Sequence, residues 1–312
     1  MIMDAKLKQY QRPPDWSSRE GGGKPAVSVV IPAYNVRDNL KNTLSSLMQQ
    51  TFPAAMFEVL VVDNGSDDGL LEMIKGVAVP FTLKYFFQGR AGRQVGKCRN
   101  IGIANATGGL VIFVDADCLC SSTLIERHVL RHRKRDALVV IGEIRMLDPD
   151  GCIDRNIRID LKKLLMKRLP TQATFKGMLK VSLYDWLQRA RRLWSAGMIY
   201  WMSGANSSAR REYLLEAGGY DEEFDMHWGD EDAELGYRLE RAGLKVVVAH
   251  EAMIFHQWHP STKSGTPGYN RILLILKHPE LAGFRMLMRR DNNFYKKTPE
   301  ELKEMLRHTL ER

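Results

Sequence analysis

The sequence of 312 residues has no apolar run close to the roughly 20 residues that a helix needs to cross a bilayer. Its polar, lysine-containing start also lacks the apolar core of a secretory signal peptide. We therefore expect a cytoplasmic protein. Cysteine is scarce, with four residues and no Cys-x-x-Cys pair, so we expect neither a disulfide framework nor a paired zinc site.

Acidic residues are outnumbered, with 37 Asp and Glu against 46 Lys and Arg, which gives a net charge of +9. A basic surface favours anionic partners such as nucleotide diphosphates, membrane surfaces or nucleic acids. Basic residues are concentrated between positions 160 and 192, where they alternate with Leu and Trp. This pattern is typical of a helix on anionic lipid, or of one whose lysines cover a core, and we favour the first interpretation.

Periodic apolar segments predict an α/β fold. The runs typical of buried strands are residues 27–31, 58–62, 82–86, 110–114, 138–144 and 245–249. The segments with helical spacing are 38–50, 98–105, 122–135 and 231–242. This alternation predicts a mostly parallel, Rossmann-like sheet flanked by helices. Thr298 and Glu301 form a capping box, which predicts a C-terminal helix over 299–311.

The chain is expected to divide into four parts. Residues 1–24 are polar, contain Pro13-Pro14 and end in three glycines, which predicts a flexible leader. Residues 25–150 carry the pattern of a nucleotide-binding half. Residues 151–262 are expected to form a catalytic, acceptor-binding half that includes the basic segment, and residues 263–312 a C-terminal helical tail.

Two acids follow the most hydrophobic predicted strand. Asp115 and Asp117 come directly after five consecutive apolar residues. Open α/β sheets bind ligands at the carboxyl ends of their strands. In an extended chain the side chains of residues i and i+2 lie on the same side, so the two carboxylates would attract a divalent cation. The alternative is a solvated turn, in which Asp is common.

A second acidic cluster, Asp230, Glu231 and Asp232, opens the helix predicted over 231–242. The helix dipole stabilises such acids, either as mere caps or with one carboxylate kept ionised as a general base. Trp228 offers a flat face for a sugar ring. A metal contact is expected from one of the three histidines that follow, which are His250, His256 and His259.

Five motifs occur in the order seen in GT-A-type family 2 glycosyltransferases. They are residues 27–35, residues 58–66, Asp-Ala-Asp at 115–117, Ser-Gly-Ala-Asn at 203–206 and Glu-Asp at 231–232. The sequence therefore resembles this family over residues 26–260. The resemblance implies a GT-A fold, in which a nucleotide-sugar-binding half meets an acceptor-side half.

The resemblance also implies roles for individual residues. Asp232 would be the catalytic base, with Glu231 beside it to orient an acceptor hydroxyl. Asp117 and His256 would ligate Mn²⁺ or Mg²⁺ on the donor diphosphate. Acceptor contacts are expected from Trp228 and Asn206. Donor contacts are expected from Pro32, Ala33, Tyr34, Asp63, Asp115 and Arg93, with Arg90 and Lys97 as alternatives to Arg93.

These roles predict a metal-dependent, inverting glycosyltransferase that uses a nucleotide-diphosphate sugar, with UDP-sugars favoured. The Gln-x-x-Arg-Trp motif of processive synthases does not occur, so we expect single addition to a glycan or lipid-linked acceptor. The basic segment would suit peripheral contact with the inner face of the membrane.

Two other functions fit the sequence less well. A sugar-1-phosphate nucleotidyltransferase would need a glycine-rich loop after the first strand, where this chain has Pro-Ala-Tyr-Asn. A non-catalytic, basic membrane-surface or nucleic-acid-binding protein would have little reason to keep two acidic clusters, because their carboxylates repel phosphate. We therefore expect no nucleic-acid partner.

Overall fold

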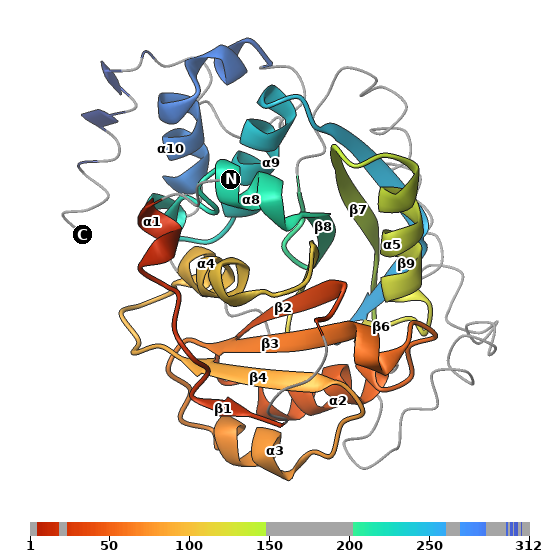
Figure 1. The fold of residues 1–312 in the computed structure, drawn as a ribbon. Helices are drawn as coiled ribbons and strands as arrows, with labels where there is room; N and C mark the ends of the chain where they lie inside the picture. The colour runs from red at the N-terminus through yellow and green to blue at the C-terminus, as the bar shows by residue number, and fades with distance from the viewer. Residues whose placement is uncertain are drawn as a thin grey trace, which may run out of the picture.

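The computed structural model describes residues 5–18, 24–147, 202–259 and 269–284, and positions 298, 300, 301, 303, 304 and 307. Within these residues, helices cover both faces of one nine-stranded sheet (Figure 1). The basic segment at 160–192 lies outside the described residues, and so does its predicted membrane contact. No helix in the described part of the chain is long and apolar enough to span a bilayer.

Five of the six predicted strands begin and end within two residues of the predicted positions, whereas the strand predicted over 245–249 continues to His256. They are β1 (Trp16–Ser17), β2 (Val27–Ala33), β3 (Phe57–Asp63), β4 (Thr82–Phe87), β5 (Leu110–Val114), β6 (Cys118–Cys120), β7 (Leu138–Met146), β8 (Asn206–Arg210) and β9 (Lys245–His256). Their order across the sheet is β1-β4-β3-β2-β5-β8-β7-β9-β6. The sequence analysis did not predict β1, β6 and β8, which are only two, three and five residues long.

Helices connect most of these strands. The α-helices are α1 (Ala5–Lys8), α2 (Arg37–Leu47), α3 (Leu70–Gly76), α4 (Val95–Asn105), α5 (Leu124–Lys134), α8 (Arg211–Glu216), α9 (Glu231–Arg241) and α10 (Tyr269–Lys277). The 3₁₀ turns are η1 (Ala54–Met56), η3 (Glu222–Phe224) and η4 (Pro279–Phe284). The predicted capping box is confirmed, because the backbone N–H of Glu301 donates to Thr298 Oγ1 at 3.2 Å and Glu301 Oε2 accepts from Thr298 N at 2.6 Å.

The central strands are parallel, as the sequence predicts. β4, β3, β2 and β5 run side by side in parallel, and Ala33 lies opposite Asp63 where β2 and β3 end. β8 then joins β5 in the antiparallel direction, so the start of β8 at Asn206 lies opposite the end of β5 at Val114. The carboxyl ends of these four parallel strands and the chain that enters β8 therefore meet at one edge of the sheet.

The two faces of the sheet carry different helices. Alternate residues of a strand point to opposite faces. Val29 therefore belongs to the apolar cluster that includes residues of α2, α3 and α5, whereas Val30 belongs to the cluster that includes residues of α8 and α9. Figure 1 shows α2 and α3 beneath the sheet and α4 above it. α4 approaches β2 closely at Gly102, where a Cβ atom would lie 2.2 Å from Val30 Cγ1.

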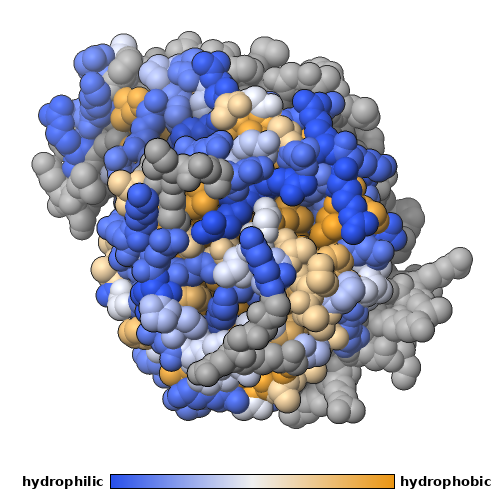
Figure 2. Space-filling model, in the orientation of Figure 1, coloured by the Kyte–Doolittle hydropathy of each residue, from blue (hydrophilic) through white to orange (hydrophobic). Residues whose placement is uncertain are grey.

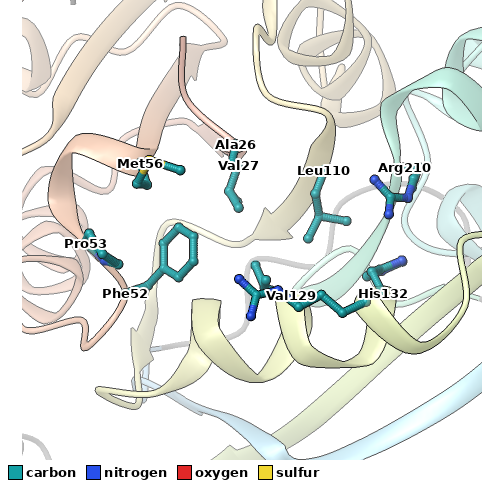
Figure 3. Close-up of a pocket in the computed structure, with 10 residues that line it drawn as sticks. Ala26, Val27, Phe52, Pro53, Met56, Leu110, Val129, His132 and Arg210 are labelled. Atoms are coloured by element: carbon teal, nitrogen blue, oxygen red, sulfur yellow. The ribbon is translucent and has the colours of Figure 1, made fainter. Parts of the chain in front are cut away.

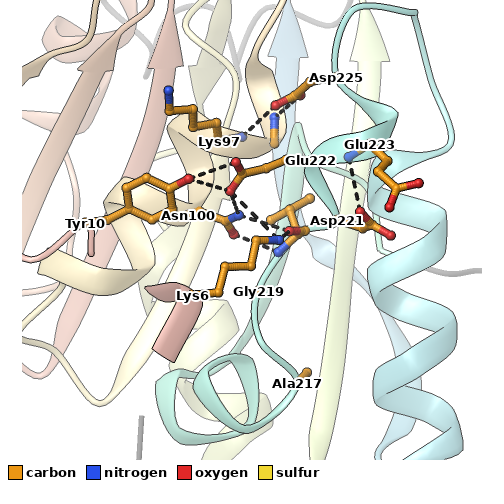
Figure 4. A network of polar contacts seen from close by, with 12 residues as sticks. Lys6, Tyr10, Lys97, Asn100, Ala217, Gly219, Asp221, Glu222, Glu223 and Asp225 are labelled. Atoms are coloured by element: carbon orange, nitrogen blue, oxygen red, sulfur yellow. Dashed lines mark hydrogen bonds and ion pairs between the residues drawn. The ribbon is translucent and has the colours of Figure 1, made fainter. Parts of the chain in front are cut away.

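The prediction of a flexible leader over 1–24 is wrong for residues 5–18. Leu7 of α1 is fully buried, and β1 pairs with β4. The Tyr10 hydroxyl lies 2.8 Å from Glu222 Oε2, and Asn100 Nδ2 donates to the other oxygen of the same carboxylate at 2.7 Å (Figure 4). Glu222 lies more than 200 residues from Tyr10 in the sequence. The polar composition of the segment could therefore not reveal this contact.

A pocket opens at the amino ends of the strands, away from the carboxyl edge (Figure 3). Its lining includes Val27 and Leu110, which are the first residues of β2 and β5. On the face shown in Figure 2, groups of hydrophobic residues are separated by hydrophilic ones. Because the pocket lies at the amino ends of the strands, it is distinct from the carboxyl edge, to which the predicted site residues belong.

Candidate active site

The Asp-Ala-Asp motif forms a turn at the carboxyl end of β5. The backbone N–H of Cys118 donates to the carbonyl oxygen of Asp115 at 3.1 Å, which closes the turn before β6 begins. The chain at this motif is therefore a turn and not extended as predicted, but the two carboxylates remain close, since burial and the charge of Asp117 together raise the pKa of Asp115 against the effect of Arg99. Because of the turn, Asp115 contacts Arg99 and Asp117 contacts two histidines, so the two acids have different partners.

Arg99 of α4 joins the two acidic clusters. Its guanidinium is 3% exposed and donates from Nη2 to Asp115 Oδ1 at 3.0 Å and from Nη1 to Glu231 Oε1 at 3.3 Å. Gly204, which precedes β8, leaves room for this group, since a Cβ atom there would lie 1.9 Å from Arg99 Nη2. The turn after β5 and the first turn of α9 thus face a common buried cation.

Glu231 and Asp232 are held in different electrostatic environments. Burial alone would raise the pKa of Glu231, but Arg93 and Arg99 outweigh burial and hold the pKa below its usual range. Burial and the neighbouring charge of Glu231 raise the pKa of Asp232 to about 7. Asp232 Oδ2 accepts a hydrogen bond from the backbone N–H of Gly204 at 2.8 Å. Asp232 is therefore poised to gain and lose a proton near neutral pH.

Asp230 does not cap α9, in contrast to one of the two interpretations of the acidic cluster. Its backbone lies in the left-handed region with φ of 66°, and its side chain makes no capping hydrogen bond to the helix. Both carboxylate oxygens instead accept from Arg271 of α10, at 2.6 and 2.9 Å. The Asp230 carboxylate therefore links the start of α9 to α10.

Two of the three candidate histidines lie at Asp117. Nε2 of His259 is 3.0 Å from Asp117 Oδ2, and Nε2 of His256 is 3.5 Å from the same oxygen. Burial alone would raise the pKa of Asp117, but His259 and His256 outweigh burial and lower it. His250 lies apart, with Nδ1 2.7 Å from Glu143 Oε2. The structure therefore favours His256 and His259 over His250 as metal ligands.

These residues fit a divalent cation. Ligand atoms of Asp117, Cys118 and His256 all lie within 4.8 Å of one another. Carboxylate oxygen and imidazole nitrogen are ligands that Mn²⁺ accepts. Burial raises the pKa of the Cys118 thiol well above its usual value, which disfavours the thiolate that a soft metal would need. Nδ1 of His256 is buried with no hydrogen-bond partner among the described residues, so this ring has no second contact there to fix its tautomer.

The predicted donor residues lie at the ends of β2 and β3 and in the loop after β4. Tyr34 is half-buried, and the Arg90 guanidinium lies 4.1 Å from its ring centre. Pro32 and Ala33 are buried. Asp63 is 1% exposed, and its two oxygens accept from Ser66 and Tyr85 within the protein. Contact of these residues with a nucleotide stays a prediction.

Arg93 lies nearer the acceptor side than predicted. Its Nη1 donates to the carbonyl oxygen of His227 at 2.9 Å, and its Nη2 donates to Glu231 Oε1 at 3.2 Å. Arg93 therefore links the loop after β4 to the loop before α9. Of the three basic candidates for the diphosphate, Arg90 is the one placed beside Tyr34.

The two predicted acceptor residues differ in exposure. Trp228 is 57% exposed, as a sugar-binding face requires. Asn206 is fully buried, and its amide bonds to His128 and to the carbonyl oxygens of Glu143 and Ala252. The structure therefore contradicts an acceptor contact for Asn206, because each polar atom of its side chain is used inside the sheet.

Arg99 is the residue of the site that the sequence analysis missed. The signal was its place in a short helix of small and apolar residues, where an unpaired arginine would be costly to bury. α4 has eight buried residues and no clear polar face, so Arg99 had to meet an acid inside the fold.

The chain is similar to known proteins in sequence and in fold. Residues 28–177 match the profile described as Glycosyl transferase family 2. The chain is 30% identical over 266 residues to the uncharacterized glycosyltransferase YfnE of Bacillus subtilis, covering 75% of this chain and 65% of the relative. It is 30% identical over 273 residues to validoxylamine A glucosyltransferase of Streptomyces hygroscopicus subsp. jinggangensis, covering 82% of this chain and 62% of the relative. The chain thus spans less than two thirds of the length of either relative.

Two solved structures share the fold. Residues 1–349 of S. aureus TarS in complex with UDP-GlcNAc give a TM-score of 0.58 at 17% identity, covering 91% of this chain and 71% of that one. Mannosyltransferase PcManGT from Pyrobaculum calidifontis in complex with GDP-Man and Mn²⁺ gives 0.56 at 17% identity, covering 96% and 75%. The fold is that of a GT-A-type glycosyltransferase. Over residues 28–177 the chain is similar to glycosyl transferase family 2.

Proposed function

We propose that this chain transfers a single sugar from a nucleotide-diphosphate donor to an acceptor hydroxyl, with inversion at the anomeric carbon and with a divalent cation bound. The observation that carries the proposal is the bridge through Arg99, which brings the acids after β5 and the acids of α9 to one cation. Asp117, His256 and His259 would hold the metal, and Asp232 would face the nucleophile.

Asp232 acts as the general base in this proposal. It removes the proton of the acceptor hydroxyl while the oxygen forms a bond to the anomeric carbon. The bond from that carbon to the diphosphate breaks on the opposite face, which inverts the centre. Mn²⁺ or Mg²⁺, when bound, neutralises charge that develops on the leaving diphosphate. Arg99 keeps Glu231 ionised beside the base, and Trp228 supplies a face for the acceptor sugar.

A UDP-sugar is the favoured donor and Mn²⁺ the favoured ion. The support comes from relatives of the same fold, because the TarS structure contains UDP-GlcNAc and the mannosyltransferase structure contains GDP-Man with Mn²⁺. A glycan or a lipid-linked sugar is proposed as the acceptor.

A screen of nucleotide-sugars tests this function. We expect at least one UDP-, GDP- or dTDP-sugar to raise the melting temperature with Mn²⁺ present and to be hydrolysed slowly, and EDTA to remove both effects. In Asp117→Ala the Mn²⁺-dependent shift should disappear. If no nucleotide-sugar stabilises the wild-type chain or is turned over, the enzyme proposal fails. Formation of a nucleotide-sugar from NTP and a sugar phosphate would instead favour a nucleotidyltransferase.

A further inference from the structure

Residues 224–230, here called the entry loop, lead directly into α9 and the proposed base. The first turn of α10 contacts this loop along its length. Asn270 is 1% exposed, and its Nδ2 lies 2.8, 3.1 and 2.6 Å from the carbonyl oxygens of Phe224, His227 and Gly229. The Tyr269 ring stacks on His227 with ring centres 3.9 Å apart. One turn of α10 therefore fixes the carbonyl groups of the entry loop.

The entry loop has a backbone conformation that needs such support. Met226 and Asp230 have φ values of 79° and 66°, and Gly229 has a φ of 91°. A left-handed conformation is unfavourable for a residue with a side chain, because Cβ approaches the following carbonyl oxygen. Arg271 donates to both oxygens of Asp230, which offsets this cost at the last residue before α9.

We propose that Arg271 and Asn270 are positioning residues that hold the entry loop so that Asp232 and Trp228 face the acceptor. The inference rests on the proposed role of Asp232 as the base. If Asp230 relaxed to a right-handed conformation, the first turn of α9 would change direction, and the Asp232 carboxylate would move with it. A base displaced by about 1 Å costs up to about a hundredfold in rate.

The other end of α10 provides a matched control. Lys277 lies 2.6 Å from Asp221 Oδ2 and 3.0 Å from Glu223 Oε2, and none of these residues belongs to the entry loop. The side chains of Lys277 and Arg271 are similarly exposed, at 26% and 29%. Loss of either cation should therefore weaken the docking of α10 to a similar degree, but only loss of Arg271 frees Asp230.

The test is a double-mutant cycle on hydrolysis of the UDP-sugar that the wild type turns over fastest, since water then replaces the unidentified acceptor. Arg271→Gln and Asp230→Asn should each lower kcat about tenfold, whereas the KM for the donor should change less than twofold. Asn is chosen because it tolerates the left-handed conformation. The double variant should lose no more than either single one, because the pair acts as a unit. Lys277→Gln should retain the wild-type kcat.

Hydrogen exchange supplies a readout that needs no activity. Backbone amides of residues 224–232 should exchange faster in Arg271→Gln and Asn270→Ala, and at the wild-type rate in Lys277→Gln. Additive losses in the cycle, or equal losses of kcat in Lys277→Gln and Arg271→Gln, would show that α10 only stabilises the fold. Unchanged exchange of these amides in both Arg271→Gln and Asn270→Ala would also overturn the proposal. A wild type that no nucleotide-sugar stabilises and that turns over no donor refutes the proposed function, while the exchange measurement still tests how the loop is held.

Discussion

Removal of Arg99 gives the sharpest test of the site, because one buried cation compensates acids from two distant parts of the chain. We consider Arg99→Met, which keeps an unbranched side chain and deletes the charge. The variant loses ion pairs of 3.0 Å to Asp115 and 3.3 Å to Glu231. Breaking a buried pair by removing one partner costs about 3–5 kcal/mol, because the remaining charge is left desolvated.

The loss of stability should depend on pH with a definite sign. In the wild type the pKa of Glu231 is held low, so its contribution to stability is present above the unfolded pKa and falls as it is protonated. Without Arg99, burial should raise the pKa of Glu231 above its unfolded value and should raise further the pKa of Asp115, which burial already holds above its usual value in the wild type. The cost is then complete above the raised pKa and is relieved as the pH falls through it.

Urea unfolding at pH 8 and pH 5 measures this difference. We expect the free energy of unfolding of Arg99→Met to be about 3–5 kcal/mol lower than that of the wild type at pH 8, with a smaller deficit at pH 5. Arg211→Met is the control, because the Arg211 guanidinium donates to the carbonyl oxygens of Ile103 and Ala104. Its deficit should be similar at both pH values. An equal deficit at pH 8 and pH 5 in Arg99→Met would refute the bridge.

Three further predictions concern the base, the metal ligands and the leader. Asp232→Asn should lower donor hydrolysis about a hundredfold without loss of UDP binding. Wild-type hydrolysis should rise with pH through about 7, where Asp232 loses its proton, and a flat profile from pH 6 to 8 would contradict its role. His259→Ala should weaken Mn²⁺ binding in calorimetry, whereas His250→Ala should not, and equal effects would count against the assignment. Tyr10→Phe should lower the free energy of unfolding by about 1 kcal/mol, since the Glu222 contact is lost, and no change would show that this contact is unimportant.

The sequence alone determined the parallel core of the sheet and the positions of the acids. The runs that became β2, β3 and β5 are short and mostly apolar because both faces of each strand are covered, whereas β4 is only partly buried. Such patterns are readable from neighbouring residues. The order of the motifs was sufficient to indicate the family, and the profile match over residues 28–177 supports it.

The tertiary structure alone decided which of these residues meet. Arg99 and Glu231 are 132 positions apart, and no periodic pattern reports a contact at that separation. The same reason explains the choice of His256 and His259 at Asp117, and the partnership of Asp230 with Arg271. Local sequence specifies how a segment is buried, whereas the pairing of charges depends on where the folded chain brings distant segments together.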